Sequence, residues 1–207
     1  MTAAGREEAP TGATRQYKPG GERREEIVRA TLAILAEEGM HAWTTAALAK
    51  RVGVSEATLF KHFDSKDDIL SAALERQAVD LRTRIEAFRA EGAAWDRVTG
   101  LAREVLRYLE ETEGGPLVIL LGHAARIRPD MREEVEKTGT LFRSRLVECL
   151  AGPDDADRDR AEVMADLVVA TVQSTCLRWS VRGHEGRLIE EATPLLALLG
   201  DAWGGTR

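Results

Sequence analysis

The sequence predicts an all-α protein, and three observations support this fold class. None of the six prolines falls between Pro19 and Pro116, so this long interval is free to be helical. Apolar residues recur three and four positions apart along most of the chain, which is the spacing of a helix face. β-branched residues nowhere alternate with polar residues in the manner of a strand. A length of 207 residues suffices for one domain, or for a small domain on a larger one.

Charge is divided unevenly along the chain. Lys and Arg number 29 and Asp and Glu number 35, which gives a formal net charge of −6. Residues 1–66 contain 10 basic and 9 acidic residues (net +1), whereas residues 67–207 contain 19 and 26 (net −7). A nearly neutral first third joined to an acidic remainder suggests two regions with different partners.

Composition argues against secreted and membrane classes. Two cysteines cannot form a disulfide framework, which favours a reducing compartment. The first 26 residues lack the apolar core of a signal peptide. The longest apolar stretch, residues 116–125, is too short to span a bilayer. We therefore expect a cytoplasmic protein that makes no contact with a membrane.

The N-terminal third is expected to hold a flexible arm followed by short helices. Residues 1–21 are rich in Gly, Thr, Ala and charge, which is typical of a mobile segment. An amphipathic helix is expected from Glu22, and Gly39 ends it. Two short helices are expected at 45–52 and 56–62.

The remaining two thirds are expected to be a bundle of longer helices. Ser65, with Asp68 three residues later, has the pattern of a capping box that opens a helix reaching about Arg89. We therefore divide the chain into a small N-terminal domain at 22–67 and a larger helical domain at 68–207. Glycines and prolines separate the later helices, which are expected near 95–112, 116–127, 130–150, 156–182 and 187–202.

Residues 44–63 have the pattern of a helix-turn-helix. Gly53 supplies the left-handed conformation of the turn, Ala49 allows the second helix to cross closely, and Ser55 is placed to cap that helix. Apolar side chains that would face inward are Val54, Leu59 and Phe63. Side chains left on or near the outward surface are Glu56, Ala57, Phe60, Lys61 and His62.

At these positions the chain resembles the tetracycline-repressor (TetR) family of transcriptional regulators. The spaced pattern of the family is present as Thr44-Thr45, Leu48-Ala49, Gly53-Val54-Ser55, Thr58-Leu59-Phe60, His62-Phe63 and Ser65-Lys66. This match covers about residues 23–70. The rest of the chain is similar to the family only in length, helix content and two interface-like final helices.

The resemblance implies a homodimer whose paired recognition helices enter successive major grooves of a palindromic operator. It also implies an interior pocket whose small-molecule effector changes the spacing of the two heads, which would make the protein a ligand-relieved repressor. Positions that commonly touch DNA in the family, mostly its phosphates, correspond to Thr45, Thr58, Phe60, His62 and Lys66. Positions that face base edges correspond to Glu56 and Ala57. Thr44, Ser55 and Lys61 complete the expected DNA-binding set.

Two residues depart from the family pattern. Phe60 stands where Tyr is common, so the hydroxyl that would donate to a phosphate is missing. Glu56 stands where Lys, Arg or Gln is common; its carboxylate either accepts from a cytosine amino group or stabilises the N-terminus of its own helix. Two interpretations are possible for Arg15, Lys18, Arg23 and Arg24: they form a basic arm that reaches DNA, or they belong to an ordinary solvated helix start.

The last two helices are apolar over more of their circumference than a one-sided surface helix requires. Apolar stripes on the first comprise Met164, Val168, Val169, Val172, Cys176 and Trp179, with Thr171 and Thr175 among them. The second carries Leu188, Ile189, Ala192, Leu195, Leu196 and Leu199. We expect a subunit interface within 156–202, the alternative being a helix central to a monomeric bundle.

The effector is expected to be small and largely apolar, although its identity is not predicted. Residues 117–121 are apolar and are followed by His123 and Arg126. The family resemblance also places Tyr108, Phe142, Gln173 and Trp179 around the pocket. A hydrogen-bonded structural histidine remains an alternative for His123, and a core position remains one for Trp179.

Two other functions remain open. A helical-bundle enzyme would need inward Glu residues and Glu-x-x-His pairs, but the single such pair, Glu38 and His41, straddles Gly39 at a helix end. No zinc spacing or Gly-rich phosphate loop is present, so no catalytic residue, metal or cofactor is expected. Cys149 and Cys176 are isolated and are interpreted as buried hydrophobes. The second alternative is a DNA-binding regulator that a protein partner controls.

Overall fold

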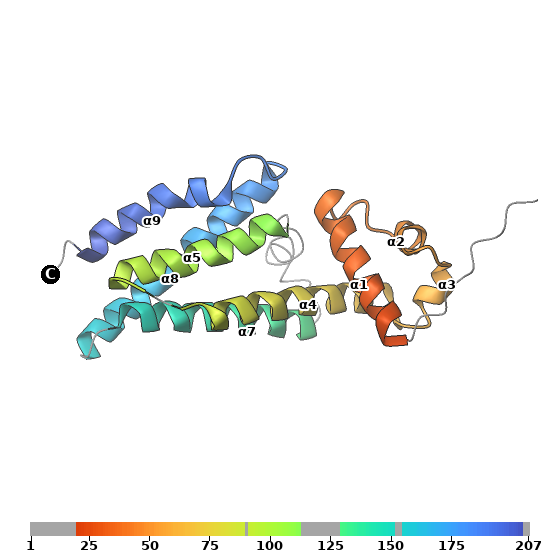
Figure 1. Ribbon diagram of the computed structural model, residues 1–207, viewed down its shortest axis with the longest axis horizontal. Coiled ribbons are helices and arrows are strands. Elements are labelled where there is room, and N and C mark those ends of the chain that lie inside the picture. Colours follow the sequence, from red (N-terminus) through yellow and green to blue (C-terminus); the bar gives the residue numbers. More distant parts are fainter. Residues whose placement is uncertain (1–19, 90, 113–128, 152–154, 205–207) are drawn as a thin grey trace, which may run out of the picture.

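The computed structural model describes residues 20–89, 91–112, 129–151 and 155–204, and within these ranges it contains helices and no strand. The helices α1 (Gly20–Glu37), α2 (Thr45–Val52) and α3 (Glu56–Leu59) form a small head at one end of an elongated molecule (Figure 1). A long helix, α4 (Lys66–Ala87), leaves the head and runs into a larger body. The prediction of an all-α chain is confirmed.

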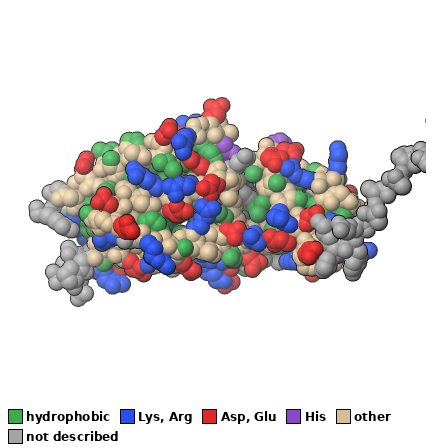
Figure 2. Space-filling view, in the orientation of Figure 1, with side chains coloured by type: hydrophobic (Ala, Val, Ile, Leu, Met, Phe, Trp, Pro, Cys, Tyr) green, Lys and Arg blue, Asp and Glu red, His purple; other side chains and the backbone are tan. Residues whose placement is uncertain are grey.

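Within the described ranges, the body consists of α4 and four further helices. Those helices are α5 (Ala94–Glu111), α7 (Pro129–Leu150), α8 (Asp155–Val181) and α9 (Leu188–Gly204). α7 packs against α4 and α8, α5 packs against α7 and α9, and α8 packs against α9. Acidic and basic side chains are interspersed over the face of the body in Figure 2. No helix in the described ranges is both long enough and apolar enough to cross a membrane.

The observed helices follow the sequence pattern closely, with one shortened element. The helix expected at 56–62 is regular only over Glu56–Leu59, and single hydrogen-bonded turns continue it to Phe63. Ser65 caps α4 as expected, because its Oγ accepts from the Asp68 N–H at 3.1 Å; the same Oγ also donates to the Asp68 carboxylate at 2.7 Å. The helix expected at 116–127 and the arm up to residue 19 lie outside the described residues.

α4 belongs to two hydrophobic cores at once. Near its start, Ile69 and Ala73 are buried in the core of the head. From the next residue, Leu74, the helix belongs to the core of the body, which also includes Leu81 and Ile85. Because protein cores are close-packed, a tilt of the body segment of α4 is transmitted to the head.

One glycine sets the distance between α9 and the rest of the body. A Cβ added at Gly200 would lie 2.3 Å from Nε1 of Trp95, so only glycine allows α9 to pack this closely over the Trp95 ring. The resulting contact joins α9 to the first turn of α5.

Candidate DNA-binding surface and effector cavity

The turn of the helix-turn-helix has the backbone geometry that the sequence predicts. Gly53 follows α2 with φ = 74° and ψ = 33°, the left-handed conformation that other residues adopt with strain. The next N–H, of Val54, donates to the Ala49 carbonyl at 2.9 Å and closes the turn. At the other end of α2, the Thr44 hydroxyl caps the helix by accepting from the Ala47 N–H at 3.1 Å.

A side-chain hydrogen bond fixes α3 against the start of α2. The Thr45 hydroxyl donates to the Glu56 carboxylate, which joins the first residues of the two helices. Beneath this bond, Leu59 is fully buried and Phe63 is 3% exposed. The carboxylate of Glu56 is therefore oriented by α2, an arrangement that neither sequence interpretation of this residue included.

The outward face of α3 carries the side chains that the sequence placed there. Glu56, Ala57 and Lys61 are exposed, and Phe60 keeps 45% of its surface accessible. His62 and Thr58 are half-buried.

The expectation that the Ser55 side chain caps α3 is wrong. Ser55 occupies the N-cap position, but its hydroxyl makes no bond to a backbone N–H of the helix. It pairs instead with the Thr58 hydroxyl at 2.9 Å. The exposed position of Ser55 leaves it on the surface beside α3.

Two cations at the edge of this surface are held by aromatic rings. Nζ of Lys66 lies 4.5 Å from the centre of the Trp43 ring and donates to the Trp43 carbonyl at 3.3 Å. The Arg24 guanidinium lies 4.1 Å from the centre of the Phe63 ring and donates to the His62 carbonyl at 3.0 Å. Arg24 thus ties α1 to the end of residues 56–63, which we call the recognition segment. For Arg24, this contact favours the interpretation of an ordinary helix start over that of an arm that reaches DNA.

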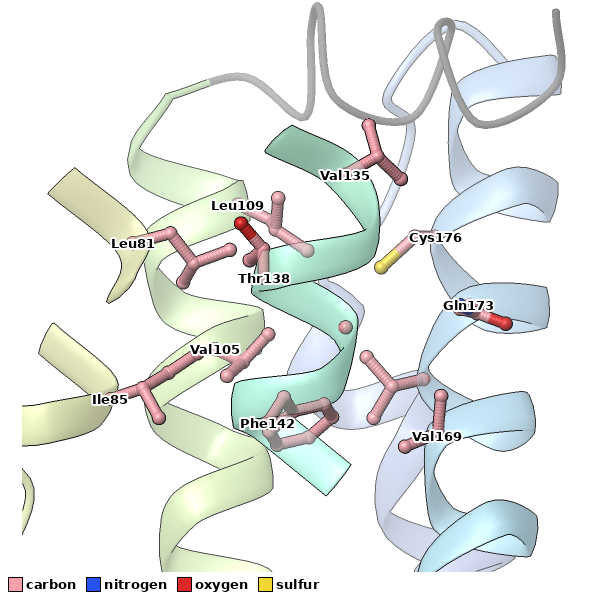
Figure 3. A pocket seen from close by; sticks show the side chains of 12 residues that line it. Leu81, Ile85, Val105, Leu109, Val135, Thr138, Phe142, Val169, Gln173 and Cys176 are labelled. Atoms are coloured by element: carbon pink, nitrogen blue, oxygen red, sulfur yellow. The ribbon is translucent and has the colours of Figure 1, made fainter. Parts of the chain in front are cut away.

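An apolar cavity of about 90 Å³ lies in the body between α4, α5, α7 and α8 (Figure 3). Its described walls are Leu81, Ile85, Val105, Leu109, Val135, Thr138, Gly139, Phe142, Val169, Val172, Gln173 and Cys176. Figure 3 shows the Phe142 ring across the lower part of this space and the Cys176 sulfur pointing toward it from α8.

The described lining of the cavity is electrically neutral. Its polar residues are Thr138, Gln173 and Cys176. Gln173 is exposed, and Figure 3 shows its side chain directed away from the cavity. Burial raises the pKa of Cys176 to about 12, so the thiol stays protonated at neutral pH. Since an unpaired charge is costly in apolar surroundings, such walls suit an uncharged group.

The residues proposed to contact an effector are distributed over several places. Phe142 and Gln173 line the cavity. Tyr108 does not, because its hydroxyl donates to the Gln77 carbonyl at 3.0 Å in the interior between α5 and α4. Trp179 is held at the turn between α8 and α9, where its Nε1 donates to the Gly186 carbonyl at 3.0 Å. His123 and Arg126 lie outside the described residues.

A charged bridge joins α4 to α7 beside the cavity. The Arg82 guanidinium donates to the Glu134 carboxylate at 2.8 Å and to the Thr138 hydroxyl at 3.0 Å. Burial raises the pKa of Glu134, but hydrogen bonds from Lys137 and Arg82 outweigh burial and leave that pKa below the usual value. Glu134 is therefore ionised at neutral pH, and Thr138 belongs to both the bridge and the cavity wall.

The wide apolar surfaces of α8 and α9 were expected to form a subunit interface, but they pack mainly inside the protomer. Most of the predicted interface stripes, including Val168, Val172 and Leu196, are buried in the protomer's own core. The choice of these residues as partner contacts is therefore wrong. A second stripe on α8, which we call the α8 seam, is exposed and consists of Val163, Leu167, Ala170, Ser174, Leu177 and Val181.

The α8 seam has the spacing of a helix-packing surface. Its members alternate four and three residues apart, as in a heptad seam. The larger ones are strongly exposed, from 46% for Leu167 to 79% for Val181. Leu198 of α9 adds a further side chain that is 66% exposed. The sequence pattern of four-three spacing could have identified this stripe beside the wider core stripe.

Among the described residues that line the cavity, only Phe142 and Gln173 were predicted from the sequence to belong to an effector site. Two of the missed contributors to the cavity region differ in the signal that the sequence carries. Gly139 lies inside α7. A glycine within a helix destabilises that helix by about 1 kcal/mol relative to alanine, so its presence indicates that close packing or function requires it there. Arg82 carries no such signal, because a charge on a long helix is usually solvated.

Comparisons with known proteins place this geometry among bacterial regulators. The sequence profile of the family described as "Bacterial regulatory proteins, tetR family" matches residues 27–73. A nucleoid occlusion factor SlmA from Vibrio cholerae is 37% identical over 133 residues, covering 61% of this chain and 67% of that protein. The same factor from Haemophilus influenzae is 37% identical over 105 residues, covering 50% of this chain, and the chain spans about half (48%) of its length.

The fold of this chain is similar to that of a solved structure over most of both chains. The transcriptional regulator FadR from Bacillus subtilis, crystallised with stearoyl-CoA, superposes with a TM-score of 0.64 at 18% identity. The superposition covers 84% of this chain and 96% of that chain. This likeness concerns the fold of head and body together.

Proposed function

The chain belongs to the TetR family of bacterial regulatory proteins, and on this premise we propose that it is a dimeric DNA-binding repressor that a small apolar effector releases from its operator. The observation that carries the proposal is the helix-turn-helix head, whose second helix leaves Glu56, Ala57, Phe60 and Lys61 uncovered. A family of regulatory proteins favours regulation over catalysis. We place its action in the cytoplasm, on double-stranded DNA.

In this proposal the head positions α3 in the major groove and cations beside it on phosphates. Lys61 is exposed on the flank of α3, and Lys66 opens α4 near the same surface. The hydroxyls of Thr44, Thr45, Ser55 and Thr58 and the ring of His62 complete the surface as backbone-facing groups. Cations on phosphates release counterions, so the binding constant should fall steeply with salt.

Selection from a random duplex library tests DNA binding directly. We expect the full chain to enrich a palindromic sequence, with half-sites about one helical turn apart. Lys61→Ala should weaken binding to all sequences alike and reduce the log–log salt slope by about 1. Lys61 is a cleaner choice than Lys66, because Lys66 also packs on Trp43.

Binding isotherms at several salt concentrations provide the readout. Lys61→Arg is the matched control, since it retains the charge and should retain the slope. Enrichment of no sequence would refute the DNA-binding proposal, and an unchanged slope for Lys61→Ala would refute the phosphate contact.

We propose that the homodimer forms through the α8 seam and Leu198 of α9. A second copy of this chain is the occupant that family membership favours, and heptad spacing allows two such seams to interlock. The interface then falls within the interval 156–202, although its contacts differ from the residues that the sequence suggested. Binding to a palindrome requires that the two-fold axis of this dimer brings both heads to one face.

The cavity is the proposed effector site, and α4 is its link to the head. Leu81 and Ile85 of α4 form part of the cavity wall, while Ile69 of the same helix is buried in the head. Arg82 and Thr138 hold α4 to α7 at this wall. An effector that separates α4 from α7 would tilt α4 and change the spacing of the heads.

The size and neutrality of the cavity define the class of effector. About 90 Å³ is less than the roughly 150 Å³ of a cavity that binds benzene, so a thin apolar group fits the space as it stands. The neutral described walls favour an uncharged inserted portion. The regulator FadR, crystallised with stearoyl-CoA, provides a precedent in the same fold for binding a molecule with a long apolar chain.

A second candidate function is favoured by the relatives named nucleoid occlusion factors. The identity of 37% to the Vibrio cholerae protein extends over 133 residues, beyond the 47 residues, 27–73, of the family match. As its name states, such a factor acts on the nucleoid, and for this chain the corresponding proposal is binding at many chromosomal sites. Chromosome-wide mapping of bound sites distinguishes the two, because a repressor would occupy a few promoters and an occlusion factor many dispersed sites.

A further inference from the structure

The outward face of the recognition segment has an apolar centre. Successive helical residues are rotated by about 100°, so Phe60 and Ala57, three positions apart, lie on one face of the helix next to Glu56. Lys61 follows in the turn that continues the helix. The helical turn extends to Phe60, whose N–H donates to the Glu56 carbonyl at 3.2 Å. The centre of this face therefore presents a phenyl ring and a methyl group, with the carboxylate of Glu56 beside them.

Phe60 is exposed although the neighbouring apolar side chains are not. Leu59 is fully buried and Phe63 is 3% exposed, whereas Phe60 is 45% exposed. The ring takes no part in the head core that holds the other two. Exposed aromatic surface is unfavourable by roughly 25 cal/mol for each Å², so a partner that covers it contributes to binding.

The chemistry of a phenyl ring limits what it can recognise on a DNA duplex. The ring has no hydroxyl, so it donates no hydrogen bond to a phosphate or to a base edge. The apolar group that base edges display in the major groove is the C5-methyl of thymine. Methyl-sized apolar contacts from Ala and Phe side chains complement that group.

Resting on the proposed DNA-binding function, we propose that Phe60 and Ala57 read thymine methyl groups in each half-site. Glu56 is oriented toward α2 by its bond to Thr45, which leaves the centre of the face to the apolar pair. Phe60 then acts as a specificity-determining residue through apolar contact. The preferred operator contains thymine at one or two positions of each half-site that face the middle of α3.

Replacement of thymine by deoxyuridine tests this proposal, because it removes the methyl group and leaves the hydrogen-bonding edge intact. The sequence enriched from a random duplex library serves as the probe, with each thymine replaced in turn. We expect one or two replacements per half-site to weaken binding of the full chain about fourfold each, the effect of burying one methyl-sized group. Other replacements should leave the Kd unchanged.

Variants at Phe60 separate this role from a general effect on the head. Phe60→Ala should bind the thymine and deoxyuridine duplexes equally at the position that Phe60 reads, with an unchanged salt slope, because no phosphate contact is lost. Phe60→Leu retains an apolar side chain and should retain the discrimination. Lys61→Ala is the matched control and should lower the salt slope by about 1 while keeping the discrimination. Thermal unfolding confirms that each variant is folded.

The outcomes distinguish failure of this inference from failure of the proposed function. If no sequence is enriched, DNA binding and the thymine contact are both refuted. If a sequence is enriched but contains no thymine, or if deoxyuridine is bound as tightly as thymine throughout, only the role of Phe60 is overturned. Discrimination that persists at every thymine in Phe60→Ala would assign the methyl contacts to residues other than Phe60.

Discussion

Leu177→Asp is expected to convert the protein into monomers and to weaken operator binding roughly 100-fold or more. Leu177 lies in the α8 seam with half of its surface exposed, and the proposed dimer covers it in both subunits. Complete burial of a leucine contributes about 1.5–3 kcal/mol, and covering the exposed half of Leu177 contributes roughly half of that in each subunit. An aspartate there loses that contribution and places an unpaired charge in an apolar contact, which adds further cost. Two heads that are no longer linked lose their effective concentration on a palindrome.

Sedimentation velocity at micromolar concentration measures the dimer, and binding to the selected operator measures its consequence. Val79→Asp is a matched control, because Val79 is 43% exposed on α4 and lies away from the α8 seam. It should remain dimeric. A Leu177→Asp protein that sediments as a dimer would exclude the α8 seam as the interface.

Gly139→Leu is expected to produce a repressor that no longer responds to effector. Gly139 lies inside α7 at the cavity wall, and a Cβ added there meets nothing within 4 Å. The leucine side chain would occupy space that the effector needs, while α7 gains about 1 kcal/mol because glycine is a poor helix former. Operator affinity without effector should stay near that of the unchanged protein.

The response to effector provides the comparison. A coupling of about 1–3 kcal/mol would weaken operator binding of the unchanged chain roughly 5- to 150-fold, and Gly139→Leu should abolish that change. Thr140→Leu is the matched control, because Thr140 is the next residue of α7 and is exposed. Release of Gly139→Leu from operator at the same effector concentration would place the effector elsewhere.

The head could be predicted nearly residue by residue because its constraints are local. The turn at Gly53, the cap at Ser65 and the outward position of Lys61 each follow from backbone conformation or helix periodicity within a few residues. The bond between Thr45 and Glu56 was not predicted, because it depends on how two short helices cross.

The body could be predicted only as helices, because its site depends on packing between distant segments. Val172 and Leu196 have the same pattern whether their stripe faces the protomer's core or a partner, and the structure places them in the core. The cavity is lined by side chains such as Leu81 and Val105 that have the composition of any core. Nothing in the sequence around Arg82 indicates its bond to Thr138, 56 residues away.

The central claim is that an effector in the cavity weakens operator binding. If this is true, the operator must weaken effector binding by the same factor, and measuring both effects tests the claim most directly. The measurement is the affinity of the protein for a small uncharged apolar molecule, found by thermal-shift screening and lost in Gly139→Leu, with and without saturating operator duplex. The account predicts that operator weakens binding of that molecule by the same factor, roughly 5- to 150-fold, by which the molecule weakens operator binding. Equal affinity for free and operator-bound protein would contradict ligand-relieved repression.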